Sequence, residues 1–277
     1  MRPRTQMIYF MKRDVEHTRK TVTTFGPACR RTMIIGACLL IASSCRTPYG
    51  PPKDFEGEWS QRELLMRSVH AYGGPEAVLT FKDLSFDCEI TVQEDGRQVK
   101  GKTHLRFKPP DRLFFTSDLD QVGNQVVLSN GRESLEFLYG APTGRDVKAD
   151  LERRRRLTMI HVFFLEGEAG EVDLGPPTKI EGRLHAVLSK KSGVETWRLW
   201  IDLDEFLIRR IRLLLPSGEG AGPMSVEWRF MDFKKAGKRL VPHAFRIFLN
   251  ARPFQEGRIT EFRMDQGLTE EDFRVKT

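Results

Sequence analysis

Two stretches of the sequence decide its fold: Trp197-Arg198-Leu199-Trp200-Ile201-Asp202 and Val226-Glu227-Trp228-Arg229-Phe230-Met231. In both, large apolar side chains occupy every second position, and charged residues fill most of the positions between them. Successive side chains of a β-strand point to opposite faces, so a period of two predicts a strand with one buried face. Both stretches are therefore expected to lie in a sheet that covers a core.

The same alternation extends over most of the chain. Turn-forming residues separate the segments, as at Asp95-Gly96, Pro109-Pro110-Asp111 and Asn130-Gly131, and an Asn-Gly pair between strand-like runs predicts a hairpin. Strands that follow one another through short turns indicate an antiparallel meander. About eleven strands are expected, at 84–94, 98–108, 112–118, 124–130, 132–139, 179–190, 194–203, 206–215, 223–234, 239–250 and 257–265.

Two segments have helical rather than strand periodicity. From Trp59 to Tyr72, apolar residues recur every three or four positions, and Gly73-Gly74 then ends the pattern. The segment 147–165 has a similar apolar stripe. A sheet of so many strands curls, so we expect a mainly β fold with few helices. It would be a curved antiparallel sheet whose concave face is covered by the 147–165 helix.

The N-terminus resembles a bacterial export signal. Two arginines precede the ten-residue apolar run 33–42, which small residues and Cys45 follow. Such a run is too short to span a bilayer as a helix, and this arrangement is typical of a lipoprotein signal. We therefore expect residues 1–44 to be an export signal and Cys45 to be the lipidated residue, although Cys38 is a possible alternative site. Residues 45–57 are rich in Pro and Gly and suit a tether, and the folded domain is expected at 58–277.

The cysteines leave two alternatives open. Removal of residues 1–44 leaves Cys45 and Cys88. Cys88 lies on the apolar face of a predicted strand, so it is expected to be a buried thiol if Cys45 is acylated. In an oxidising compartment the two could instead form a disulfide.

The distribution of charge argues against nucleic-acid binding. The chain has 45 basic and 38 acidic residues, and eight of the basic and two of the acidic ones lie in residues 1–44. Residues 45–277 therefore carry 37 basic and 36 acidic side chains. A nucleic-acid interface needs clustered positive charge on the folded domain, so no nucleic-acid partner is expected.

Motifs that carry catalytic chemistry are missing from the sequence. It contains no G-x-S-x-G, H-E-x-x-H or C-x-x-C pattern, which excludes the common signatures of serine hydrolases, zincins and zinc or thiol-redox sites. Asp202, Asp204 and Glu205 could in principle bind calcium or act as paired carboxylates, but acidic residues are common at a hairpin turn. We therefore expect neither an enzyme nor a metal site, and no cofactor.

Several short motifs, in this order, resemble those of outer-membrane lipoprotein-sorting (LolA/LolB-like) proteins. The resemblance spans about residues 61–273. The matching motifs are Ala71-Tyr72-Gly73-Gly74 with Ala77 and Leu79; Leu199-Trp200-Ile201-Asp202 with Leu207-Ile208-Arg209; Phe230-Met231-Asp232-Phe233 with Gly237-Lys238-Arg239-Leu240-Val241-Pro242-His243; and Asp265-Gln266-Gly267-Leu268 with Asp272-Phe273.

The resemblance implies an unclosed β-barrel, covered by helices, around an apolar cavity that accepts acyl chains of lipids or lipoproteins. Side chains on the presumed inner face would form the cavity wall, although a slip of one residue in register would invert this assignment. The expected wall residues are Phe115, Trp197, Leu199, Trp228, Phe230, Phe245 and Ile247. The expected lid residues are Leu151, Leu157, Ile160 and Phe164.

The run Arg153, Arg154, Arg155 and Arg156 has two interpretations. It is either a solvated helix face or a contact site for anionic lipid headgroups. Together with the signal, the resemblance predicts a lipid-anchored envelope protein at the outer membrane, facing the periplasm, whose partner is a lipid or an acylated lipoprotein. An alternative is a non-enzymatic envelope scaffold or stress sensor that binds a protein partner.

Overall fold

The computed structural model describes residues 59–94, 96–120, 122–166, 171–216 and 223–274. Its centre is one antiparallel sheet of thirteen strands in the order β6-β5-β4-β3-β2-β1-β13-β12-β11-β10-β9-β8-β7. β1 and β13, which are the first and last strands in the sequence, pair with each other in the middle of the sheet. The sheet is therefore continuous from its edge strand β6 to its other edge strand β7. The strands are β1 Leu84–Glu94, β2 Arg97–Lys108, β3 Arg112–Leu119, β4 Gly123–Asn130, β5 Ser134–Leu138, β6 Ala141–Pro142, β7 Val172–Ile180, β8 Arg183–Ser192, β9 Glu195–Asp202, β10 Ile208–Leu215, β11 Met224–Ala236, β12 Arg239–Leu249 and β13 Arg252–Met264.

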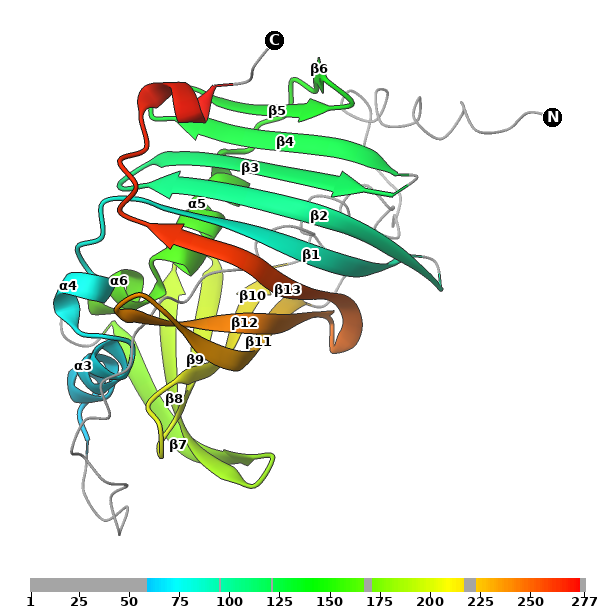
Figure 1. The fold of residues 1–277 in the computed structure, drawn as a ribbon. Coiled ribbons are helices and arrows are strands. Elements are labelled where there is room, and N and C mark those ends of the chain that lie inside the picture. Colours follow the sequence, from blue (N-terminus) through cyan, green and yellow to red (C-terminus); the bar gives the residue numbers. More distant parts are fainter. Residues whose placement is uncertain (1–58, 95, 121, 167–170, 217–222, 275–277) are drawn as a thin grey trace.

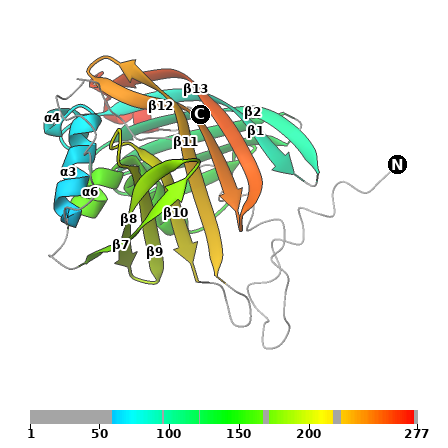
Figure 2. The ribbon, with the colours of Figure 1, turned by 90° about the horizontal axis from the view of Figure 1, so that it is seen from below.

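The sheet is strongly curved and is not closed. Figure 1 shows the part from β1 to β6 turned against the part from β7 to β12, and Figure 2 shows the second part curving beneath the first. Helices α3, α4 and α6 gather at one end of the sheet, and α5 lies behind it in Figure 1. The helices are α3 Gln61–Ala71, α4 Pro75–Val78, α5 Lys148–Thr158 and α6 Ile160–Leu165, with a short 3-10 turn, η2, at Glu270–Phe273. The predicted fold class, a mainly β unclosed barrel covered by helices, is confirmed.

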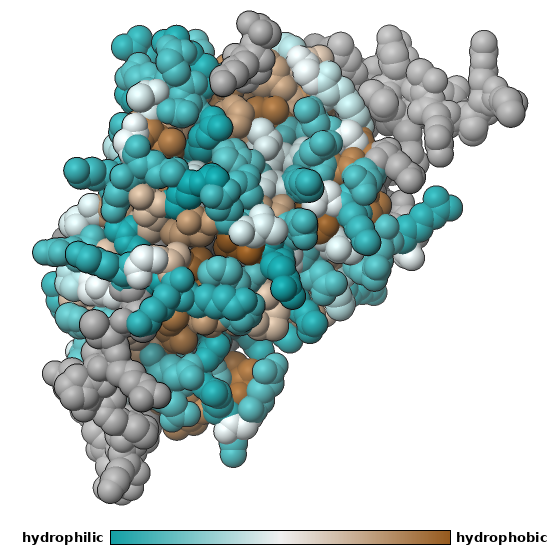
Figure 3. Space-filling view, viewed as in Figure 1, coloured by the Kyte–Doolittle hydropathy of each residue, from teal (hydrophilic) through white to brown (hydrophobic). Residues whose placement is uncertain are grey.

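The strand alternation builds the core. In β3, Leu113, Phe115, Ser117 and Leu119 are buried, and the residues between them are more exposed. The side chains buried in this way form one large hydrophobic cluster, which includes residues of the helices and of the strands. On the outer face seen in Figure 3, hydrophilic residues are mixed with small hydrophobic areas.

The prediction of eleven strands was wrong, because β6 and most of β7 were missed. β7 contains Gly175-Pro176-Pro177, which is typical of a turn. Proline lacks an N–H and is tolerated in a sheet at an edge strand or a bulge. β7 meets both conditions, since it is the last strand of the sheet and its register shifts between Gly175 and Thr178.

The expected single helix over 147–165 is broken in two. Met159 separates α5 from α6, and its backbone angles, φ −110° and ψ 38°, are not helical. Apolar residues on either side of this break, Leu157 and Ile160, are both buried. Both short helices therefore contribute apolar side chains to the core.

Candidate functional site

The seven residues expected to form a cavity wall all lie on the buried face of the sheet. They come from β3, β9, β11 and β12, and none is more than 5% exposed. Strand pairing aligns them across the sheet, because Trp228 pairs with Ile247 and Phe230 pairs with Phe245. The structure thus brings together the side chains that the sequence placed on one face: Phe115, Trp197, Leu199, Trp228, Phe230, Phe245 and Ile247. Their contact with a ligand stays a prediction.

The four expected lid residues are buried in the same core as this wall. Leu151 and Leu157 from α5 and Ile160 and Phe164 from α6 are buried and belong to the same hydrophobic cluster as the wall. Phe163 of α6 provides a direct aromatic contact, because its ring centroid lies 5.6 Å from that of Trp197. The α5–α6 segment therefore packs over the inner face of the sheet, as expected for a cover.

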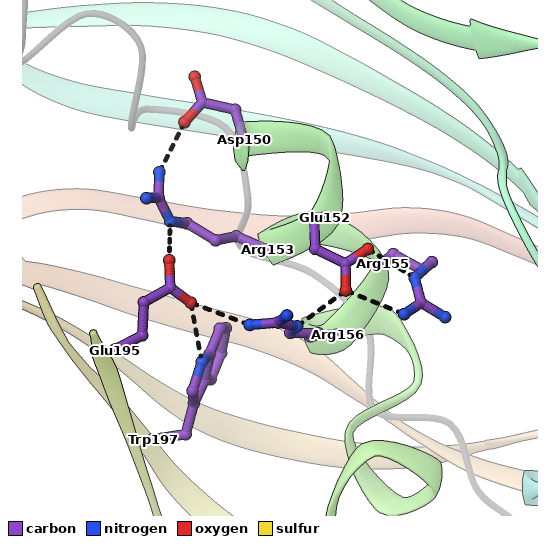
Figure 4. Close-up of polar contacts among 7 residues, drawn as sticks. All are labelled: Asp150, Glu152, Arg153, Arg155, Arg156, Glu195 and Trp197. Carbon is purple, nitrogen blue, oxygen red and sulfur yellow. Dashed lines mark hydrogen bonds and ion pairs between the residues drawn. The ribbon is translucent and has the colours of Figure 1, made fainter. Parts of the chain in front are cut away.

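Charged groups attach α5 to the sheet. Glu195, at the start of β9, accepts a hydrogen bond from Arg153 Nε at 2.6 Å and another from Arg156 Nη1 at 3.1 Å. The same carboxylate accepts the indole N–H of Trp197 at 3.2 Å. Figure 4 shows Glu195 between the two arginines of α5. We call these three residues, Arg153, Arg156 and Glu195, the latch.

A second set of contacts lies within α5 itself. Glu152 accepts hydrogen bonds from Arg155 at 2.8 and 2.9 Å and from Arg156 at 2.8 Å, and Arg153 also contacts Asp150 at 2.9 Å. Hydrogen bonding from Arg155 holds the pKa of Glu152 below its usual value. These pairs, three or four residues apart, stabilise the helix without attaching it to the sheet.

Arg154 differs from its three neighbours because it points into the interior. It is 4% exposed, and its guanidinium lies 4.6 Å from the ring centroid of Phe115. Burial lowers its pKa to about 10, while the charges of Asp150 and Glu136 act in the opposite direction. Arg154 is thus a cation placed against a wall residue. The other three arginines are partly exposed and are paired with carboxylates.

A buried polar pair joins α3 to α6. Ser68 Oγ and His161 Nε2 are 2.9 Å apart, and Tyr72 contacts the His161 ring edge-on at 5.0 Å. Burial lowers the pKa of His161 to about 3, so its ring is neutral at neutral pH.

The acidic group considered for calcium has a structural role at a turn. Asp202 accepts the backbone N–H groups of Asp204 and Glu205 and pairs with Arg183 at 2.9 Å. Among the described residues, no group of His, Cys, Asp or Glu side chains is arranged to hold a metal ion. Nor does the described part of the chain include a helix long and apolar enough to cross a membrane.

Glu195 is the residue of this site that the sequence analysis missed. A signal for it was present, because Glu195 has the same parity as Trp197 and Leu199 and so shares their inner face. An acidic side chain on such a face requires a polar partner, and the arginine run was the available set of cations. Two other predicted features, the export signal at 1–44 with Cys45 and the tether at 45–57, lie outside the described residues.

Comparison with known proteins gives similarity at the level of fold. No family model matches the sequence, and no curated protein matches it significantly. Among solved structures, the LolA superfamily protein NE2245 from Nitrosomonas europaea is similar with a TM-score of 0.53 at 12% identity. The match covers 79% of this chain and 99% of that protein.

Two further structures match over a similar length with lower TM-scores. An outer membrane lipoprotein-sorting protein domain from Vibrio parahaemolyticus has a TM-score of 0.46 at 12% identity and covers 76% of this chain and 95% of its own. A DUF1329 family protein from Desulfovibrio piger has a TM-score of 0.48 at 14% identity and covers 77% and 95%. The chain thus has the fold of the LolA superfamily protein, in agreement with the resemblance seen in its motifs.

Proposed function

We propose that this protein is a non-enzymatic envelope protein that binds acyl chains of lipids or lipoproteins between its curved sheet and the α5–α6 segment. The acyl chain would contact the seven wall residues on one side and the four lid residues on the other. Contact between apolar surfaces contributes about 25 cal/mol per Å², so such a ligand is retained without any catalytic group. The fold supports this proposal, because it is shared with a LolA superfamily protein and the sequence motifs resemble lipoprotein-sorting proteins.

The observation that carries the proposal is the way in which α5 is attached. Its apolar residues are buried in the same cluster as the wall residues, whereas the bonds that fix it to β9 are the ionic and hydrogen bonds of the latch. Apolar contacts can be exchanged for contacts with an acyl chain at little cost, because the two are chemically alike. A latch at the rim can then open and close while the wall stays in place.

We further propose that Cys45 carries the lipid anchor and that the protein faces the periplasm from the outer membrane. Contact of the arginine run with anionic headgroups is part of this proposal for Arg153, Arg155 and Arg156, whose side chains are 19–33% exposed. Arg154 would instead act from the interior, since it is buried. Replacement of Cys45 by Ala should move the protein from the membrane fraction to the soluble fraction.

The direct test is the identification of bound lipid. Protein that lacks the lipid anchor (residues 46–277), purified without detergent, should carry acyl lipids in native mass spectra, and it should bind cis-parinaric acid saturably with about 1:1 stoichiometry. The proposal would be refuted if the purified protein carried no lipid and, while folded by circular dichroism, did not bind the probe.

Binding of a protein partner is the second candidate, and exposed apolar side chains at both edges of the sheet favour it. Leu135, Leu138 and Tyr139 are exposed near β5, and Leu174 and Leu184 are exposed on β7 and β8. Edge strands offer unpaired backbone groups to another chain. Two results together would favour this function over lipid binding. Cross-linking in the native envelope would capture one protein in stoichiometric amount through these edges, and the purified protein would carry no lipid.

A further inference from the structure

Two stacked tryptophans in the interior differ in what their N–H groups contact. The rings of Trp197 and Trp228 are nearly parallel, at 4°, with centroids 6.4 Å apart. The N–H of Trp197 donates to Glu195 of the latch at 3.2 Å. The N–H of Trp228 is also buried, but among the described residues it has no hydrogen-bond acceptor. A buried donor without an acceptor is unfavourable and uncommon in folded proteins.

A buried acceptor without a donor lies in the same row of the sheet. Trp228 on β11 pairs with Ile247 on β12, and Ile247 pairs with Gln255 on β13. Gln255 is 5% exposed, and its Oε1 atom has no hydrogen-bond donor in the described part of the chain. Residues paired in register lie on the same face, so both side chains stand on the inner face with Ile247 between them.

The other residues of this row are apolar. The row continues from Trp228 through Ile211 to Leu199, and from Gln255 to Val92 and Val99. Ser117 Oγ is another buried atom without a described partner, but it lies in a different row of the sheet. That row runs from Ser117 through Thr103 to Cys88, and Cys88 is four residues away from Val92 along β1. Trp228 and Gln255 therefore form an isolated donor and acceptor among the residues proposed to line the acyl site.

We infer that Trp228 and Gln255 together bind a secondary amide that carries an acyl chain. The amide carbonyl would accept the N–H of Trp228, and the amide N–H would donate to Oε1 of Gln255. The acyl chain would then extend over the apolar wall. This inference rests on the proposed acyl-binding function and assigns it a ligand class, because an amide satisfies both atoms whereas an ester offers only an acceptor and a hydrocarbon offers neither.

The test compares three ligands of one chain length: N-methyldodecanamide, methyl dodecanoate and tetradecane. Each is titrated against cis-parinaric acid bound to the purified protein. The amide should bind more tightly than the ester, and the ester more tightly than the alkane, each by about 3- to 10-fold for one hydrogen bond. Equal affinities for the three would overturn the inference while leaving acyl binding intact, whereas displacement by none of them would refute acyl binding itself.

Two variants separate the two hydrogen bonds. Trp228→Phe removes the N–H and keeps an aromatic ring, so the advantage of the ester over the alkane should disappear. Gln255→Met keeps a similar volume without the amide oxygen, so the advantage of the amide over the ester should disappear while that of the ester over the alkane remains. Trp200→Phe is the matched control, because Trp200 lies on the opposite face of β9 near Arg210 and Arg212, and it should leave all three ratios unchanged.

Folding of each variant is checked by circular dichroism, and Gln255→Met decides alone if Trp228→Phe does not fold. A ratio of amide to ester affinity that Gln255→Met leaves unchanged would overturn the inference. A secondary amide can come from an N-acylated polypeptide or from an N-acyl lipid. Stronger binding of an N-dodecanoyl dipeptide amide than of N-methyldodecanamide would identify the first source, and equal or weaker binding the second; either result supports recognition of the amide.

Discussion

Arg153 Nε donates to the carboxylate of Glu195 at 2.6 Å, across 42 residues of sequence, and this bond attaches helix α5 to strand β9. Arg156 binds the other oxygen of the same carboxylate. One acidic residue of β9 and two cations of α5 therefore attach the helix to the sheet. The stability of the protein and the exchange of ligand are expected to depend on these contacts.

Replacement of Glu195 by Gln should loosen the lid. The amide keeps the shape but loses the charge that both arginines contact, so we expect the free energy of unfolding to fall by about 1–2 kcal/mol. Backbone amides of α5 should exchange hydrogen faster, and bound parinaric acid should dissociate faster.

Glu152→Gln is the matched control for the latch. Glu152 binds Arg155 and Arg156 within α5 and makes none of the latch contacts. Its replacement should cost about 0.5 kcal/mol or less and leave the exchange of α5 amides and of ligand nearly unchanged. Equal effects of the two substitutions would contradict the role given to Glu195.

Acidification should weaken the packing of α3 against α6 through His161. Burial lowers the pKa of His161 from 6.5 to about 3, so between these values the unfolded chain binds a proton that the folded chain does not. Stability must therefore fall as the pH decreases below 6.5, with a contribution from this residue of up to about 1.4 kcal/mol per pH unit.

The contribution of His161 is measured as a difference between proteins. Urea unfolding of the wild type and of His161→Gln at several pH values between 4 and 6.5 should give a shallower dependence for the variant. Carboxylates with lowered pKa values, such as Glu152 and Glu227, affect both proteins alike. His70→Gln, at an exposed position of α3, should keep the slope of the wild type, and parallel curves for all three proteins would exclude this role of His161.

Replacement of Asp83 by Asn should separate the C-terminal segment from β1. The buried carboxylate of Asp83 accepts the backbone N–H groups of Gln266, Gly267 and Leu268 at 2.8, 2.9 and 3.0 Å. An asparagine would direct an NH₂ group at some of these donors, so we expect a loss of about 1–3 kcal/mol, measured by thermal unfolding. Asp265→Asn, whose side chain is 46% exposed, should cost less. A larger loss for Asp265 than for Asp83 would disagree with this account.

Replacement of Gly257 by Ala should disturb the wall. A Cβ atom at this position would overlap the ring of Phe245, its cross-strand neighbour. Displacing a buried ring costs about 1–3 kcal/mol, which urea unfolding would detect. Gly175→Ala is the control, since its Cβ atom would meet Val187 at ordinary contact distances of 3.6 Å or more; a cost equal to that of Gly257→Ala would mean that Phe245 is not held over the glycine.

The local pattern of the sequence determined the strands and the faces on which their side chains lie. Alternation along β9 and β11 placed Trp197, Leu199, Trp228 and Phe230 on one face, and each is buried there. This works because the period of two is a local property of the backbone, which each strand adopts regardless of its partners. At Gly175-Pro176-Pro177 the local sequence indicates a turn, yet these residues lie in strand β7. A strand can form there because β7 is at the edge of the sheet, and the sequence alone does not show which strand lies at an edge.

The tertiary structure alone decided which polar groups meet. The latch joins residues about 40 apart, and Trp228 and Gln255 share a row only because β12 lies between their strands. The break at Met159 likewise interrupts a segment whose apolar pattern predicted one helix. Periodicity fixes the direction of a side chain relative to its own strand or helix, but its neighbours from other elements depend on strand order, register and curvature, which result from the packing of the whole chain.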